Sequence, residues 1–359
     1  MTTRERMLAV YQHQMPDKFP VGIYSRYLPR GAAERELRGK GLGIIDYYPL
    51  VSFIGPPWHN NPGFTSEIKN TNIRVEYSWG GTGIIERRTY ETPVGSVWQE
   101  REASVGAGSE HTRKHYICDI EDYKIMAYII ENTVIKSNEA EIVRRIDAMG
   151  DDGVVLGRMD RSPYQKLLIE LAGAEQFLVD LYMGEDAVTQ LMEVMGVRMD
   201  ESIDMAMNSR AKLVWQPDNV TSDMTPPNSF REYVLPYYKK LSQKTKATGK
   251  TLIAHMDGKI KALKDDIAGS GIDVIESFSL KMIGGDMELA EAREAFSGIT
   301  ILPNFPSNLS QNSEEEILDF LGGFKVAAGE DEPYMLQVSE DLADDTWKQV
   351  LPLIVSVML

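Results

Sequence analysis

Short apolar runs alternate with amphipathic segments along most of the chain. From about residue 140 onward, runs rich in Val, Ile and Leu are separated by stretches with helical periodicity, which is typical of repeated βα units around a parallel sheet. Strands are predicted over residues 19–24, 153–157, 213–216, 252–255, 274–278, 299–302 and 334–338, and helices over 139–149, 165–181, 186–207 and 227–248. Seven or eight such units fit a closed (β/α)8 barrel, the TIM barrel, better than an open doubly wound sheet, because no Gly-rich dinucleotide motif follows the first strand.

Between residues 64 and 117 the pattern changes to short segments in which apolar and polar residues alternate. Segments 73–77, 84–90 and 94–98 show this alternation, with glycines between them. Alternation with a period of two predicts antiparallel strands or hairpins. We therefore expect a single domain over residues 1–359 that contains a β-rich insertion at 64–117, which would act as a lid or as a platform for a partner.

Composition and charge narrow the classes of function. The 359-residue chain carries a formal charge of -16, which argues against nucleic acid as a partner because such binding depends on Lys and Arg contacts to phosphate. Cys118 is the only cysteine, so one chain can form neither an internal disulfide nor a metal site with several thiolates. The N-terminus lacks an apolar signal-type core, and no segment has the length of a membrane span. We expect a cytoplasmic protein with a small-molecule substrate.

The ends of the predicted strands carry the residues that could perform chemistry, because the catalytic groups of a βα barrel lie at the carboxyl ends of its strands. In chain order these residues are Arg158, Asp160, Asp218, Asn219, His255, Asp257, Glu276, Asn304, Glu340 and Asp341. One histidine among several acids is the composition of a divalent metal site with oxygen ligands, or of a general acid/base centre. For any single acid, the alternative is a helix cap or a solvated loop group.

His255 is the strongest of these candidates. It ends an apolar run that starts at Thr251 and directly precedes Met256-Asp257-Gly258. The alternative for His255 is a core histidine that donates to a backbone carbonyl.

A second group of residues is predicted to line a substrate pocket. Large flat side chains near a barrel mouth suit an apolar or aromatic substrate. The predicted pocket residues are Tyr24, Tyr27, Trp58, His59, Asn219 and Asn304. The aromatic residues of the N-terminal half could equally pack in a small core of the insertion.

Several segments together resemble the uroporphyrinogen decarboxylase superfamily over nearly the whole chain. These segments are 4–8, 16–21, 227–239, 255–258, 271–274 and 289–293. The resemblance implies a (β/α)8 barrel. The superfamily includes decarboxylases of a tetrapyrrole and zinc-dependent methyltransferases that work with corrinoid proteins.

The resemblance also shows where this chain departs from the thiol-methylating members. In those methyltransferases a strand ends in His-x-Cys-Gly, and a later Cys completes the zinc site. Here Asp257 and Glu340 occupy the two Cys positions, so both thiolates are absent. Segments 88–96, 276–278 and 285–286 are most similar to the branch that carries out corrinoid-dependent O-demethylation of methyl ethers.

This resemblance implies a methyltransferase that cleaves a methyl ether and passes the methyl group to the cobalt of a separate corrinoid protein, since no Asp-x-His-x-x-Gly corrinoid motif occurs in the chain. The aromatic residues favour an aryl methyl ether. We expect zinc, or another divalent metal, bound by His255, Glu276 and Glu340, with Asp257 as a fourth ligand or as a neighbouring acid. His255, Asp257 and Asp218 are the predicted catalytic residues.

Two other functions stay open at this point. The first is the tetrapyrrole decarboxylase itself, because Arg26, Tyr27 and Arg30 resemble its Arg-containing N-terminal segment. The acidic balance of the chain argues against it, since that substrate carries several carboxylates. The second is a non-catalytic barrel that binds a small ligand or a corrinoid protein.

Overall fold

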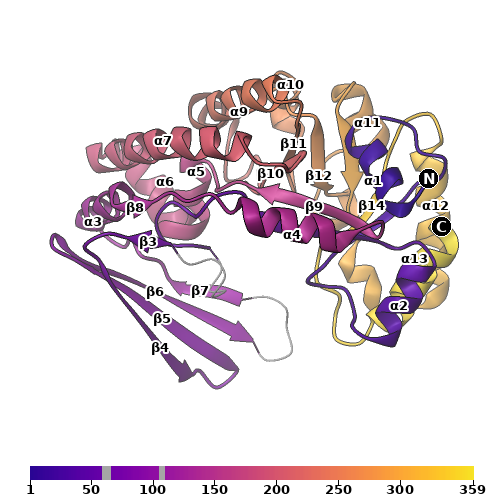
Figure 1. Cartoon of the computed structure of the whole chain (residues 1–359), viewed down its shortest axis with the longest axis horizontal. Coiled ribbons are helices and arrows are strands. Elements are labelled where there is room, and N and C mark those ends of the chain that lie inside the picture. The colour runs from indigo at the N-terminus through magenta and orange to yellow at the C-terminus, as the bar shows by residue number, and fades with distance from the viewer. Residues whose placement is uncertain (59–65, 105–109) are drawn as a thin grey trace. The chain divides into compact units, whose positions relative to one another are not determined.

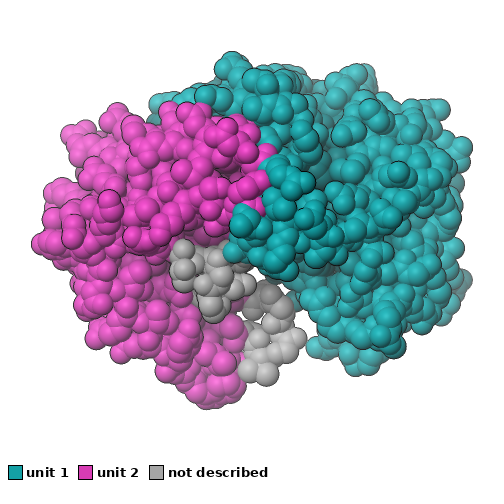
Figure 2. Space-filling view, viewed as in Figure 1, with its two compact units in different colours: residues 1–48, 140–158, 210–359 teal, residues 49–139, 159–209 magenta. Residues whose placement is uncertain are grey.

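The computed structural model describes residues 1–58, 66–104 and 110–359. These residues pack as two compact units, coloured separately in Figure 2. Unit 1 comprises Met1–Tyr48, Ala140–Arg158 and Arg210–Leu359, and unit 2 comprises Pro49–Glu139 and Met159–Ser209.

Eight strands form a nearly closed parallel barrel, which confirms the predicted (β/α)8 fold (Figure 1). Neighbouring strands in the sheet follow the chain order β1-β2-β9-β10-β11-β12-β13, and the last strand, β14, pairs with β1. A bridge between Asn304 and Gln337 joins β13 to β14. The strands are β1 Val21–Tyr24, β2 Gly43–Pro49, β9 Gly153–Arg158, β10 Leu213–Gln216, β11 Thr251–His255, β12 Val274–Phe278, β13 Thr300–Pro303 and β14 Leu336–Val338.

Helices follow the barrel strands, as the predicted βα repeat requires. In unit 1 they are α1 Thr3–Tyr11, α2 Ala32–Gly39, α4 Glu139–Met149, α8 Pro227–Ser229, α9 Leu235–Ala247, α10 Lys264–Ala268, α11 Leu289–Ala295, α12 Glu314–Ala328 and α13 Trp347–Met358. The helix predicted as continuous over 227–248 contains a π-helical turn at Phe230–Val234. Pro236 lies two residues after this turn. Since proline has no N–H and crowds the preceding turn, the wide turn accommodates it.

The inside of the barrel is filled by alternate residues of the strands. The core cluster takes Leu213 and Trp215 from β10 and Val154 and Leu156 from β9, two residues apart in each case, because successive side chains of a strand point to opposite faces. Helix α1 adds Met7, Val10 and Tyr11 to the same cluster. Backbone hydrogen bonding of Arg4 to Asp151, just before β9, places α1 at the amino ends of the strands.

Unit 2 contains the antiparallel sheet that the alternating pattern predicted. Its strand order is β4-β5-β6-β7, with no crossover. The strands are β4 Asn72–Trp79, β5 Gly83–Thr92, β6 Gly95–Ser104 and β7 Glu110–Lys114, and a separate pair joins β3 Glu67–Ile68 to β8 Thr133–Val134. Unit 2 also includes residues 159–209, so it extends well beyond the 64–117 insertion predicted from the sequence.

The helices of unit 2 depart from the prediction at two points, because the helix at 120–131 was not predicted and the helix at 165–181 is interrupted. They are α3 Ile120–Glu131, α5 Pro163–Lys166, α6 Ala174–Met183 and α7 Asp186–Met207. The helix predicted over 165–181 is interrupted by a π-helical turn at Leu167–Leu171. The helical segment then stops before Gly173, whose φ is +79°. A Cβ at Gly173 would meet the His115 ring at 2.6 Å, so only glycine fits this close approach. Among the described residues, no helix is both long and apolar enough to cross a membrane.

Candidate functional site

The candidate site forms the layer of side chains directly above the barrel core. Ile253 of β11 and Val274 of β12 belong to the core cluster, and two residues further along each strand stand His255 and Glu276. Because the side-chain direction repeats every second residue, both point into the barrel near its carboxyl end. The two residues are register partners on neighbouring strands.

Glu276 is the centre of this layer. It is fully buried and accepts hydrogen bonds from three side chains. The Tyr24 hydroxyl donates to its Oε1 at 2.6 Å, and the Trp215 indole N–H donates to Oε2 at 3.1 Å. The Nδ1 atom of His255 lies 2.6 Å from the same Oε2. Because a carboxylate can only accept hydrogen bonds, Nδ1 carries a hydrogen and donates as well.

His255 lies between two carboxyl groups. While Nδ1 contacts Glu276, Nε2 is 3.7 Å from Oδ2 of Asp257. Burial of the imidazole opposes its positive charge, but Glu276 and then Asp257 favour that charge more strongly and raise the pKa of His255 to about 10. His255 is therefore a protonated imidazolium at neutral pH in the metal-free protein.

Asp257 brings further negative charge to the Nε2 side of His255, and Glu340 interacts electrostatically with both residues. The Asn219 side-chain amide donates to Oδ2 of Asp257 at 3.2 Å. Burial raises the pKa of Glu340, and repulsion by Asp257 adds to this effect while His255 opposes it. Asp257 thus lies close enough to Glu340 to disfavour ionisation of Glu340. Such a pair is stabilised by a cation between them.

An aromatic cluster in unit 1 flanks these polar residues. The Tyr24 ring stacks on Tyr27 with centroids 6.3 Å apart, and Tyr47 lies 5.8 Å from Tyr24 and 5.1 Å from Trp215. The edge of the cluster reaches His255, whose ring is 5.8 Å from Trp215 at 90°. Tyr27 and Tyr47 are only partly buried, so the cluster offers flat apolar surface beside the acids.

Comparison with known proteins identifies the family. The family described as uroporphyrinogen decarboxylase (URO-D) matches residues 138–324, which is more than half of the 359 residues. The chain belongs to the uroporphyrinogen decarboxylase family. The matched residues include β9 to β13 and therefore both His255 and Glu276.

Solved structures are also similar to this chain, and the first of them shows the same fold. A methyltransferase from Methanosarcina mazei has a TM-score of 0.60 and 13% identity, over 100% of this chain and 98% of that one. A GH18 chitinase from Flavobacterium johnsoniae has a TM-score of 0.36 and 10% identity, over 64% of this chain and 82% of that one. None of the curated proteins matches the chain.

The donor set of this URO-D protein fits a divalent metal. In the part of the chain that the structure describes, no three His, Cys, Asp or Glu side chains are already arranged as a metal site. Nε2 of His255 nevertheless faces Asp257, and burial, with repulsion by the same acid, raises the pKa of Glu340. One imidazole nitrogen and two carboxylates are suitable ligands for zinc and other divalent ions.

The other predicted residues have identifiable places. Asp218 is fully buried and accepts a hydrogen bond from the Gln216 amide at 2.9 Å; its catalytic role stays a prediction. Asn304 Oδ1 accepts from the backbone N–H of Ser339 at 3.2 Å, which ties β13 to β14. Trp58 belongs to unit 2, where its ring lies beneath the guanidinium groups of Arg101 and Arg161 at 4.6 and 5.4 Å. His59 lies outside the described residues.

The sequence analysis missed Trp215 and Tyr47. Trp215 lies one residue before the end of a predicted strand, and only the residues at and after the strand ends were considered as candidates. The available signal was that Trp215 stands two residues after Leu213 on the predicted strand, so both side chains point to the same, inward face. Tyr47 lies on β2, which was not predicted because its two isoleucines are followed directly by the charged residue Asp46. In the structure the carboxylate of Asp46 pairs with Arg145 of α4 at 2.7 Å.

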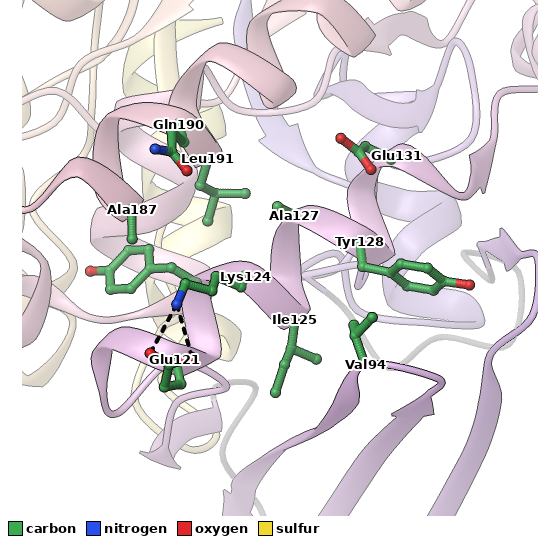
Figure 3. A pocket seen from close by; sticks show the side chains of 11 residues that line it. Val94, Glu121, Lys124, Ile125, Ala127, Tyr128, Glu131, Ala187, Gln190 and Leu191 are labelled. Carbon is green, nitrogen blue, oxygen red and sulfur yellow. Dashed lines mark hydrogen bonds and ion pairs between the residues drawn. The ribbon is translucent and has the colours of Figure 1, made fainter.

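Unit 2 contains a separate open pocket of about 440 Å³ between α3 and α7 (Figure 3). Aliphatic and aromatic side chains such as Ile125, Tyr128 and Leu191 line most of it, and Lys124 pairs with Glu121 at 2.9 Å. No residue of the candidate site lines this pocket.

Proposed function

We propose that this URO-D protein is a methyltransferase that cleaves an aryl methyl ether and passes the methyl group to the cobalt of a separate corrinoid protein. In this proposal a divalent metal, zinc in the first instance, activates the leaving oxygen. The observation that carries the proposal is the fixed orientation of His255, whose Nδ1 is held by Glu276 while Nε2 faces a second carboxylate.

The geometry supports a division of roles among the predicted ligands. Both oxygens of Glu276 are already engaged by Tyr24, Trp215 and His255. We therefore assign Glu276 a positioning role, like the carboxylates that orient metal-binding histidines in other proteins. His255 through Nε2, Asp257 and Glu340 would hold the metal.

The chemistry of a methyl ether explains why oxygen ligands suit this reaction. The bond between the methyl carbon and oxygen breaks with its electron pair on oxygen, so the site must stabilise a developing phenolate. A bound divalent cation would supply Lewis-acid polarisation of that oxygen. Two carboxylates make a harder ligand set than two thiolates, and a hard cation favours oxygen over sulfur.

The protein's own side chains have three tasks in this reaction. Glu276 keeps the imidazole of His255 in one tautomer and one orientation. Asn219 fixes one oxygen of Asp257 by its hydrogen bond of 3.2 Å. The partly buried rings of Tyr27 and Tyr47 offer flat surface for the arene of the substrate.

The corrinoid part of the proposal rests on the sequence resemblance and on what the chain lacks. The sequence contains no corrinoid-binding motif of the Asp-x-His-x-x-Gly type, so the acceptor would come from another protein. The likeness to the Methanosarcina methyltransferase concerns the fold at 13% identity. It is consistent with methyl transfer and does not by itself carry the proposal.

A methyl-transfer assay with defined reagents tests the proposal. The zinc-loaded protein is mixed with reduced cob(I)alamin and with 2-methoxyphenol or a methoxybenzoate, and the cobalt spectrum reports transfer. We expect transfer that is lost on chelation, restored by zinc, and reduced at least a hundredfold in His255→Ala and Glu340→Gln. His111→Ala is the matched control, because that histidine is exposed on β7.

Two results would count against the proposal. Full transfer by a metal-free preparation would remove the role of the metal. Decarboxylation of uroporphyrinogen by the same preparation, without transfer from any methyl ether, would instead assign the activity after which the family is named.

A further inference from the structure

The outer strand of the antiparallel sheet in unit 2 has an unusual surface. Strand β4 is hydrogen-bonded to β5 on one side and is the edge of the sheet on the other. All eight of its residues, Asn72–Trp79, are exposed. On one face, Ile73 and Val75 are 39% and 38% exposed, and Tyr77 and Trp79 are 67% and 65% exposed. Since these residues alternate along the strand, they form one continuous apolar stripe.

Apart from two residues of opposite charge, Arg74 and Glu76, this edge lacks the devices that normally prevent strands from pairing with other chains. Such devices are short length, proline, lysine and β-bulges. Strand β4 contains neither proline nor lysine and pairs with β5 over eight consecutive residues without a bulge. The opposite edge of the same sheet, β7, has five residues, includes Arg113 and Lys114, and is adjacent to a register shift at Glu100. One edge is therefore protected and the other is open.

The sequence of β4 is complementary to itself in the antiparallel direction. With Val75 on a twofold axis, Arg74 lies opposite Glu76 of the second copy, and Ile73 lies opposite Tyr77 of the second copy. Both the charge pair and the apolar pair then occur twice. The faces also match, because a twofold axis perpendicular to the sheet keeps the apolar stripe of both copies on the same side.

Neighbouring registers are unfavourable. An axis at Arg74 places the two arginines opposite each other, and an axis at Glu76 places the two glutamates opposite each other. Like charges directly opposite each other destabilise a strand pair. In the single chain the two side chains make only a loose contact of 3.6 Å and are each about half exposed. Arg74 also contacts Glu91 of β5 at 3.9 Å. Both contacts are long, so the two side chains can exchange them for closer pairs with the second copy.

We propose that β4 pairs antiparallel with β4 of a second copy of this chain, with Val75 on the twofold axis, and so joins two sheets into one continuous eight-stranded sheet. The occupant is a second copy because the strand is self-complementary in charge and in apolar side chains. This inference is independent of the proposed methyl transfer.

Sedimentation velocity of the full chain over a wide concentration range tests the pairing. We expect a concentration-dependent species of twice the 40.4 kDa monomer mass. Arg74→Glu or Glu76→Arg alone should weaken the dimer at least tenfold, because like charges then face each other. The double variant Arg74→Glu/Glu76→Arg should restore it. Arg113→Glu, on the protected edge, is the matched control and should leave the dimer unchanged.

Disulfide crosslinking tests the register. In a Cys118→Ser background, which removes the only native cysteine, Val75→Cys should give a covalent dimer on oxidation because the two residues face each other across the axis. Ile73→Cys and Tyr77→Cys in the same background should not, since each faces a different residue. A monomer at every concentration, or a charge-swapped double variant that stays monomeric while folded, would overturn the proposal.

Discussion

Replacing Glu276 by glutamine separates the positioning of His255 from the other features of the site. The substitution keeps the shape of the side chain and removes its charge. Three donors converge on this carboxyl group, from Tyr24, Trp215 and His255. A glutamine offers one acceptor oxygen, and its NH2 group must face at least one of these donors.

The expected cost follows from the burial of the group. Hydrogen bonds to a charged partner contribute about 1.5–3 kcal/mol each, and removing one member of a buried ion pair costs about 3–5 kcal/mol. Because Glu276 is fully buried, little of this is recovered from water. We expect Glu276→Gln to lower the free energy of unfolding by about 3–5 kcal/mol.

Glu340→Gln is the matched control, since it makes the same chemical change in the same site. Burial and Asp257 raise the pKa of Glu340, so its ionised form opposes folding at neutral pH. Removing that charge should leave the metal-free protein as stable as before or more stable. Zinc affinity should fall in both variants, because one loses a ligand and the other loses the orientation of His255.

Urea denaturation of the chelated proteins and zinc titration calorimetry together measure these two effects. A change below about 0.5 kcal/mol for Glu276→Gln, which is the usual size for surface substitutions, would show that the three hydrogen bonds do not stabilise the fold. A larger loss for Glu340→Gln than for Glu276→Gln would contradict the assignment of their charges.

Further predictions concern the same barrel and one helix. The raised pKa of His255 means that protonation of His255 stabilises the metal-free protein. This contribution is fully present below pH 6.5 and should disappear as the pH rises through about 10. In His255→Gln, the denaturation midpoints measured at the two ends of this pH range should therefore lie closer together than in the unsubstituted protein. Trp215→Phe removes one donor to the buried carboxylate of β12 and should cost about 1–3 kcal/mol in the same denaturation assay. Gly153→Ala places a Cβ 2.0 Å from a backbone oxygen of β2 and should cost about 1–3 kcal/mol or more. Gly196→Ala, in the middle of α7 with open space around it, should instead raise stability by about 0.5–1 kcal/mol, as thermal unfolding of the two variants would show.

Regular segments of the fold were predictable because their pattern is uninterrupted. Helices α4 and α7 and strand β12 have the predicted bounds, since each combines a clear periodicity with polar or glycine residues at its ends. Strand β2 was missed because its apolar run is only two residues long before Asp46. The helices around Pro236 and Gly173 were predicted as continuous, because periodicity alone does not show the wide turns that these residues require.

From the sequence, only those site residues could be predicted that lie at the carboxyl ends of the strands. His255, Asp257 and Glu276 were identified because parallel strands present their last residues at one edge. The sequence could not show that Glu276 accepts three hydrogen bonds, since Tyr24 and Trp215 come from strands far away in the chain. The distinction between a ligand and a positioning residue is a property of side-chain geometry, which no single-chain pattern encodes.

If the proposed metal is bound, His255 links the metal-free and metal-loaded states of the site. In the metal-free protein the imidazolium of His255 compensates the charge of Glu276 and Asp257. A metal bound through Nε2 must replace the proton there, so metal affinity and pH are coupled. With two carboxylates in place of two thiolates, this histidine carries the exchangeable proton near neutral pH, whereas a thiolate site would release protons from its cysteines. The imidazolium of His255 thus offsets part of the negative charge of the site when no metal is bound.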